Sequence, residues 1–151
     1  MNISTIDASY IPQIVSLASS IPYDTGTLGN LDLINNFEQS IKSAPNTLID
    51  VMSDSINSMY FENVRNKRAY KIVVRIWCLI ENRQQQAQLD LNYLEEQFIE
   101  LIEQNMETLV ANMPGFEYTE NNQIASQNKN YVENYITKEI SWTIYKIVNI
   151  D

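Results

Sequence analysis

Residues 70 to 81, YKIVVRIWCLIE, form a nearly continuous apolar run that is rich in β-branched and aromatic side chains, a composition typical of a strand. Alternate positions give this strand two different faces. One face is wholly apolar and consists of Ile72, Val74, Ile76, Cys78 and Ile80, and the other is mixed and consists of Lys71, Val73, Arg75, Trp77 and Leu79. We therefore expect a central strand whose apolar face is covered by a helix.

The chain continues with a helix, a short strand and a final long strand. A helix is expected from about Asp90, as its N-cap, to Asn112, before Pro114 and Gly115. Its apolar stripe comprises Leu91, Leu94, Phe98, Leu101, Ile102, Met106 and Leu109. Residues 115 to 119 indicate a short strand, residues 120 to 130 a polar surface loop, and residues 137 to 150, TKEISWTIYKIVNI, a strand by their alternation.

The segment before the strong strand carries helical spacing. Asn46 is expected to cap a helix, because apolar residues recur at steps of three and four at Leu48, Ile49, Met52, Ile56 and Met59 or Tyr60. The polar residues 65 to 68, RNKR, then indicate a turn, the tip of a hairpin whose first arm is residues 59 to 64.

Residues 1 to 45 are interrupted by three of the four prolines and two of the three glycines. Short helices are expected over residues 12 to 20 and 31 to 43, with a loop over residues 22 to 30 between them. Such an arm is either flexible or ordered against a neighbouring subunit. We therefore divide the chain into an arm, residues 1 to 45, and a core domain, residues 46 to 151.

The fold class expected from these elements is α+β. A small mixed or antiparallel sheet packs against helices in the order α-β-α-β-β, with an irregular helical N-terminal arm. At 151 residues the chain is long enough to bury a core without disulfides, and Cys78 is expected to be a buried thiol.

Charge and hydropathy limit the partners. Nineteen acidic and ten basic residues give a net charge of −9, which disfavours binding to phosphate backbones and also promotes solubility. We expect no secretory signal in residues 1 to 20 and no membrane span, and hence a soluble protein of the cell interior.

The chain has little catalytic chemistry. It contains no histidine, one cysteine and three glycines, so it holds neither a Ser-His-Asp triad, a zinc cluster nor a phosphate-binding glycine loop. The carboxylate pairs Glu95 with Glu96 and Asp50 with Asp54 are expected on solvated helix faces. We expect a protein that is not an enzyme, with no catalytic, cofactor-binding or metal-binding residues.

Interaction surfaces are the alternative source of function. An acidic stripe on the long helix, Glu96, Glu100, Glu103 and Glu107, is either a solvated face or a docking surface for a basic partner. Arg75 beside Trp77 could form a cation–π or interface pair. The remaining candidates are Asn122, Gln123 and Ile124 in the polar loop, and Tyr145 on the half-polar face of the last strand.

The order of elements from residue 46 to 150 resembles the tail terminator and tail-completion (neck) proteins of long-tailed bacteriophages. The resemblance is carried by AYKIVVRIWCLIE, DLNYLEEQFIELIEQNMETL, GFEYT with its step Gly115, Phe116, Glu117 and Tyr118, and KEISWTIYKI. It implies a virion protein, assembled in the host cytoplasm, that forms a homo-hexameric ring.

That ring would cap the tail tube protein, end its polymerisation and dock onto a head–tail connector or stopper protein. DNA would pass through it without specific binding, and no cofactor or membrane is implied. A second hypothesis is an acidic inhibitor that mimics DNA, with the four glutamates of the stripe standing in for phosphates, or another small protein-interaction module.

Overall fold

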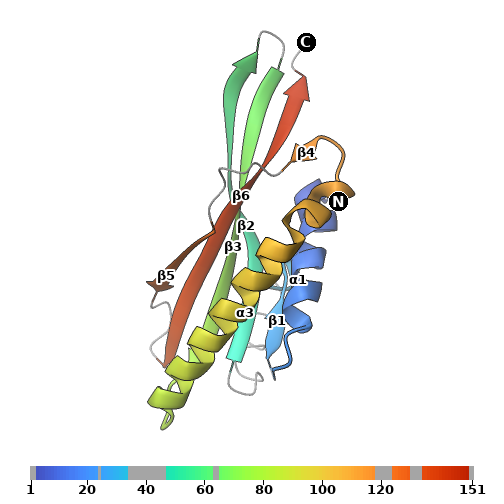
Figure 1. Cartoon of the computed structure of the whole chain (residues 1–151). Coiled ribbons are helices and arrows are strands. Elements are labelled where there is room, and N and C mark those ends of the chain that lie inside the picture. Colours follow the sequence, from blue (N-terminus) through green and yellow to red (C-terminus); the bar gives the residue numbers. More distant parts are fainter. Residues whose placement is uncertain are drawn as a thin grey trace.

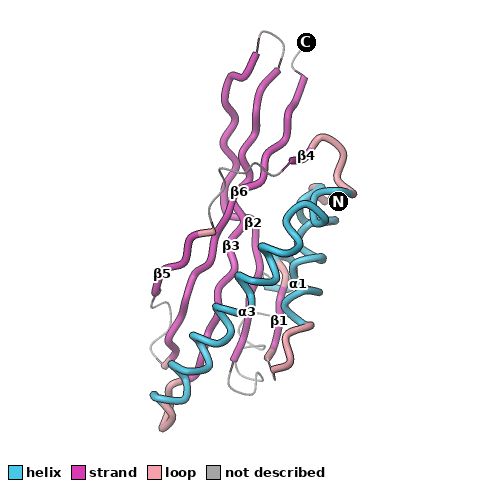
Figure 2. The backbone as a smooth tube through the Cα atoms, in the orientation of Figure 1, coloured by secondary structure: helices cyan, strands magenta, loops and turns pink. Residues whose placement is uncertain are grey.

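The computed structural model describes residues 3–23, 25–33, 47–62, 65–117, 124–129 and 134–149. They form an α+β fold in which a six-stranded mixed sheet packs against helices, as the sequence predicts (Figure 1). Figure 2 shows the two layers: the sheet lies on one side, and helices α1 and α3 lie across part of its length on the other.

Three long antiparallel strands form the centre of the sheet. They are β2 (Thr47–Glu62), β3 (Arg65–Leu79) and β6 (Tyr135–Asn149), with β3 in the middle. On one side β1 (Gly26–Leu28) pairs in parallel with β2, and on the other β4 (Phe116–Glu117) and β5 (Ala125–Lys129) both pair antiparallel with β6. The single parallel pair makes the sheet mixed.

Helices cover one face of this sheet. The chain starts with a π-helical turn, η1 (Ile6–Tyr10), and continues into α1 (Ile11–Ser19), while α3 (Gln84–Ala111) connects β3 to β4. The expected helix over residues 12 to 20 is thus confirmed, with Pro12 in its first turn, where the missing N–H has no helical partner to lose. Residues 30 to 33 are also helical, and the rest of the expected 31–43 helix lies outside the described residues.

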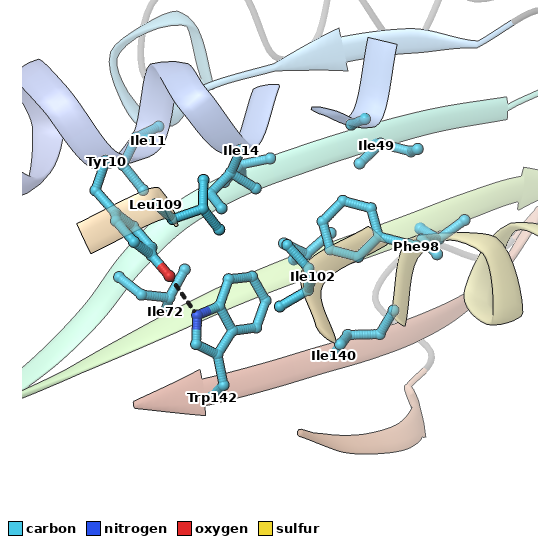
Figure 3. Packing of buried hydrophobic residues seen from close by; sticks show 14 of the residues in the cluster. Tyr10, Ile11, Ile14, Ile49, Ile72, Phe98, Ile102, Leu109, Ile140 and Trp142 are labelled. Carbon is cyan, nitrogen blue, oxygen red and sulfur yellow. Dashed lines mark hydrogen bonds between the residues drawn. The ribbon is translucent and has the colours of Figure 1, made fainter. Parts of the chain in front are cut away.

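The hydrophobic core lies between the helices and the sheet (Figure 3). At its centre Trp142 of β6 packs near Phe98 of α3, with ring centroids 6.3 Å apart. The Nε1–H of Trp142 donates a 2.8 Å hydrogen bond to the hydroxyl of Tyr10, which lies at the junction of η1 and α1. These three side chains link both helices to the last strand, and all three are almost completely buried.

The two predicted strand faces are confirmed. Ile72, Val74, Ile76 and Cys78 of β3 are all fully buried on the helix-covered face, and Ile140, Trp142 and Ile144 of β6 join them there. The other face of the sheet, which we call the second face, mixes apolar and charged side chains.

The helix expected after Asn46 is wrong, because residues 47 to 62 form strand β2. Both faces of β2 are buried where it starts: Ile49 and Val51 lie on the helix-covered face, and Leu48 and Asp50 on the second face. Because consecutive residues on both faces are buried here, the sequence lacks the alternation of apolar and polar residues that is typical of a strand with one exposed face. A register shift between Ser53 and Ser55 then changes the parity of the later residues, which imitated helical spacing.

The hairpin was predicted correctly in kind, but residues 65 to 68 belong to strand β3 and do not form its tip. The register continues to the pair Glu62 and Arg65. Beyond the ends of α1 and α3, the three long strands extend as a projection, residues 54–62, 65–71 and 143–149, visible at the top of Figure 1. Apart from the row of Tyr70 and Ile144, which is buried against the core, no helix covers the projection (Figure 1). Polar residues therefore occur on both of its faces, and the strand pattern disappears from the sequence.

Three other boundaries also differ. The expected loop over residues 22 to 30 contains β1, and the expected loop over residues 120 to 130 contains β5. Both strands are short and polar or glycine-containing, so their structure comes from pairing with a long neighbour. Helix α3 starts at Gln84, six residues before the expected cap Asp90, because the glutamine-rich segment is helical. The predicted short strand after Gly115 is confirmed as β4.

The N-terminal segment packs onto its own chain. Ile6, Tyr10, Ile11, Ile14, Ala18 and Ile21 belong to the same hydrophobic cluster as the sheet and α3. The sequence suggested either a flexible arm or an arm ordered by a neighbouring subunit. Packing of this segment against the core of its own chain was not predicted.

Candidate functional site

The acidic face of α3 is one candidate surface. Glu96, Glu100, Glu103 and Glu107 are all exposed, and the helix carries six acidic residues (these four with Asp90 and Glu95) and no basic residue. Within the described ranges, none of the four carboxylates forms an ion pair. We call these four residues the acidic face. Their mutual repulsion is a few tenths of a kcal/mol per pair, so the core contacts of α3 easily maintain the helix.

An open hollow lies on the same helix, lined by Asn92, Glu95, Glu96, Ile99, Glu100 and Glu103. Glu95 differs from its neighbours because it is engaged within the chain. Its Oε1 lies 2.9 Å from the Lys138 ammonium of β6, and its Oε2 accepts a hydrogen bond from the Ser126 hydroxyl of β5. Glu95 therefore fastens the edge of the sheet to α3, and the exposed carboxylates around it are the ones that face outward.

The projection is a second candidate surface, of the opposite charge. It carries five of the ten basic residues of the chain, Arg65, Lys67, Arg68, Lys71 and Lys146, against two acidic residues, Asp54 and Glu62. These give it a formal charge of +3, whereas α3 has −6. This surface was not predicted from the sequence, because residues 65 to 68 were expected to form a turn. The signal that could have indicated it is that half of the basic residues of the chain fall within residues 65–71 and 143–149.

Tyr145, a candidate from the sequence, lies in the projection. Its position opposite Ala69 of β3 places it on the second face of the sheet. The Lys67 ammonium lies 4.4 Å from the centre of its ring, a cation–π contact. Tyr145 therefore contributes to a partly exposed surface that contains both an aromatic ring and a positive charge.

Arg75 and Trp77 lie together on the second face, nearer the middle of the sheet. Asp50, Arg75 and Glu139 are neighbours across β2, β3 and β6. Arg75 Nε is 3.5 Å from Glu139 Oε2, and Trp77 Nε1–H donates a 3.0 Å hydrogen bond to Asp50 Oδ2. Trp77 is 2% exposed and the Arg75 side chain is 23% exposed, so the two predicted residues take part in a largely buried polar row within one chain.

Asp50 has the most unusual environment of this row. The prediction that Asp50 and Asp54 share an exposed helix face is wrong: both lie in β2, and Asp50 is fully buried. Burial raises the pKa of the Asp50 carboxyl to about 6, although the Arg75 charge and the Trp77 hydrogen bond oppose the shift. Its Oδ1 has no hydrogen-bond partner among the described residues.

A separate cluster surrounds Asp90 at the start of α3. Its carboxylate accepts hydrogen bonds from Arg83 Nη2 at 2.7 Å and Gln86 Nε2 at 2.8 Å. Burial would raise the pKa of Asp90, but hydrogen bonds from Tyr23, Gln86 and Arg83 together with the Arg83 charge lower it. Asp90 therefore stabilises the first turns of α3 as a buried anion rather than as the predicted N-cap.

The third predicted surface was the polar loop. Ile124 is half-buried and packs against the main core, and Asn122 and Gln123 lie outside the described residues. The Cys78 thiol is buried as expected, and burial raises its pKa to about 12.

In the described part of the chain, no three side chains of the histidine, cysteine, aspartate and glutamate types come together as metal ligands. None of the helices described combines the length and hydropathy needed for crossing a bilayer.

Comparison with known proteins adds no relative. No protein family model matches this chain, and no curated protein matches its sequence.

Proposed function

We propose that this protein is a structural virion subunit that forms a ring at the head-proximal end of a phage tail. The ring, a homo-hexamer, ends polymerisation of the tail tube and joins the tail to a head connector or stopper protein. In this role the protein is not an enzyme, and it acts in the tail or neck of the virion after assembly in the host cytoplasm.

The observation that carries this proposal is the pairing of two surfaces of opposite charge on one subunit. The projection has a formal charge of +3 and extends beyond the helices, while α3 has −6 and exposes four carboxylates that form no ion pair within the described residues (Figure 1). A ring requires a heterologous contact, in which one surface of a subunit binds a different surface of the next. A subunit with two complementary and separate surfaces fits that requirement.

Four of the elements that carry the resemblance support the same proposal. A strong strand, a long helix, a short strand after Gly115 and a final long strand are present, whereas the leading helix of that order is replaced by strand β2. The net charge of −9 also suits a ring through which DNA must pass without binding, since like charges repel the phosphate backbone.

The test is the mass of the purified protein in solution, alone and with a tail tube protein encoded by a neighbouring gene, followed by electron microscopy of the tubes. We expect a ring at one end of each tube and an end to tube growth. Tubes that grow at an undiminished rate with no protein at their ends would contradict the proposal. A monomer observed without tubes is compatible with it, because the tube end can be the template for the ring.

The exposed acidic face favours a second candidate, an inhibitor that mimics DNA. The four carboxylates extend over eleven helical steps from Glu96 to Glu107, about 16 Å at 1.5 Å per residue, comparable with a short run of phosphates. A protein that binds a nuclease or restriction enzyme as a strict monomer, and leaves tail tubes unchanged, would favour this candidate over the ring.

A further inference from the structure

The helix-covered face of the sheet is left without helices where it continues into the projection. The strand register places Ile56, Tyr70 and Ile144 in one row of this face, with Ser58, Arg68 and Lys146 in the next. Tyr70 and Ile144 are still buried under the end of the core, but Ile56 is 62% exposed. An exposed isoleucine beside a buried core row marks where the helical cover stops.

Two like charges lie side by side on this face, and both side chains are half-buried. Arg68 and Lys146 are direct partners across β3 and β6, an arrangement that destabilises an isolated sheet. The Lys146 ammonium lies 5.1 Å from the centre of the Phe116 ring, and no acidic side chain of the described residues forms an ion pair with either cation. Anionic groups from another molecule would relieve this repulsion.

The acidic face of α3 has the negative charge that this surface lacks. Its exposed carboxylates surround the half-buried Ile99 in the open hollow, so it offers negative charge around an apolar centre. The two surfaces therefore match in sign.

We propose that the projection of one copy docks on the acidic face of α3 in a second copy. Arg68 and Lys146 of the first copy face Glu96 and Glu103 of the second, and Ile56 lies against the hollow at Ile99. The helix of the second copy thereby continues the helical cover of the sheet in the first. This contact rests on the proposed ring and specifies its subunit interface. Two copies joined in this way still have one free projection and one free acidic face between them, so a further copy can bind at either end.

Charge reversal tests the contact. The variant Arg68→Glu with Lys146→Glu places acidic side chains on both sides of the proposed contact, and the variant Glu96→Lys with Glu103→Lys places basic side chains on both sides. Each alone should lose self-association by about a hundredfold, because like charges then meet across the interface. An equimolar mixture should recover it, since every contact between the two variants joins opposite charges.

The matched control reverses charges on the other face of the same projection. Lys67→Glu with Lys71→Glu changes the net charge by the same amount as the first variant, but these side chains lie on the second face. We expect this control to self-associate as the wild-type protein does. Equal losses in the control and in the Arg68 and Lys146 variant would show that only net charge matters, and would overturn the proposal.

Cysteine cross-linking detects the contact even if the free protein is mainly monomeric. The only native thiol, Cys78, is fully buried, so introduced cysteines react selectively. A mixture of Ser58→Cys and Gln104→Cys proteins with a short bismaleimide should give a heterodimer, because Ser58 lies opposite Arg68 and Gln104 lies beside Glu103. Ser58→Cys with Gln85→Cys, at the other end of α3, is the control pair.

A heterodimer yield no greater than that of the control pair would overturn the contact. This failure is distinguishable from failure of the ring proposal. If the wild-type protein and the Arg68 and Lys146 variant both cap tail tubes equally well, the ring stands and the contact is wrong. If the wild-type protein does not cap tubes but the charge rescue and the cross-link are observed, the self-contact stands and the tail function is wrong.

Discussion

Asp50 makes the stability of this protein depend on pH in a direction opposite to that of most carboxylates. Burial raises the pKa of its carboxyl from the ordinary value of 3.8 to about 6. Between these two values the folded protein holds the proton and the unfolded chain has lost it. The free energy of unfolding therefore falls as the pH rises through this range, and the stabilisation is fully present only below about pH 4.

The magnitude follows from the size of the shift. A difference of about two units, at about 1.4 kcal/mol each, gives about 3 kcal/mol between the acidic and neutral limits. Because Asp50 is fully buried, water does not screen this effect. The variant Asp50→Asn has no proton to lose at this position, and its amide oxygen can still accept the hydrogen bond from Trp77. The stability of the wild-type protein relative to the variant should thus fall by about 3 kcal/mol from about pH 4 to about pH 7.

Urea unfolding at a series of pH values measures this difference. Both tryptophans of the chain, Trp77 and Trp142, are 2% exposed, so their fluorescence reports unfolding of both faces of the sheet. Asp54→Asn removes an exposed carboxylate from the same strand and controls for the loss of one negative charge. A free-energy difference between the wild-type protein and Asp50→Asn that is the same at every pH would refute the reasoning.

Three further substitutions test the fold, each by urea unfolding. Tyr10→Phe should cost about 1–3 kcal/mol, because it removes the acceptor of the buried Trp142 N–H. Phe98→Ala should cost about 3–5 kcal/mol, since Phe98 is fully buried at the centre of the core. Gly115→Ala should cost about 1 kcal/mol, because Gly115 has a φ of 85°, in a region unfavourable for residues with a Cβ atom.

Each of these substitutions has a clear contrary outcome. An unchanged stability for Tyr10→Phe would mean that the indole N–H finds another acceptor. A cost below about 1 kcal/mol for Phe98→Ala would contradict its place in a tightly packed core. For Gly115→Ala, a stability equal to or above that of the wild-type protein would show that the turn before β4 adopts another conformation.

The sequence predicted the elements in which one face is buried and the other is not. Strand β6 and helix α3 have one buried face and one partly or fully exposed face, so their periodicity survives in the order of residues. The acidic face of α3 and the buried thiol of Cys78 followed from the same periodicity and were also predicted. At the start of β2, where both faces are buried, and in the projection, where helices cover neither face beyond Tyr70 and Ile144, the pattern disappears and the prediction failed. Strand β3 is also buried on both faces, but its β-branched and aromatic residues identified it as a strand.

The residues of the candidate surfaces also divide into those that the sequence could group and those that only the structure brings together. Glu96, Glu100, Glu103 and Glu107 could be grouped from the sequence alone, because their spacing of three and four residues places them on one side of a helix. The partners of Arg75 and Trp77 could not be predicted, since Asp50 and Glu139 come from strands 25 and 64 positions away along the chain. Only the register of the sheet brings these residues together.

By itself, the sequence determined the fold class, the long helix with its acidic face and the final strand, because local periodicity encodes which side of an element is buried. The tertiary structure alone decided that β2 is a strand, that Asp50 is buried and that three strands extend beyond the helices. Each of these depends on pairing between segments that are distant in the sequence, and the free energy of such pairing is not encoded in either segment alone. The same pairing gathers five basic residues at the end of the sheet, opposite in charge to the helix that the sequence had already identified.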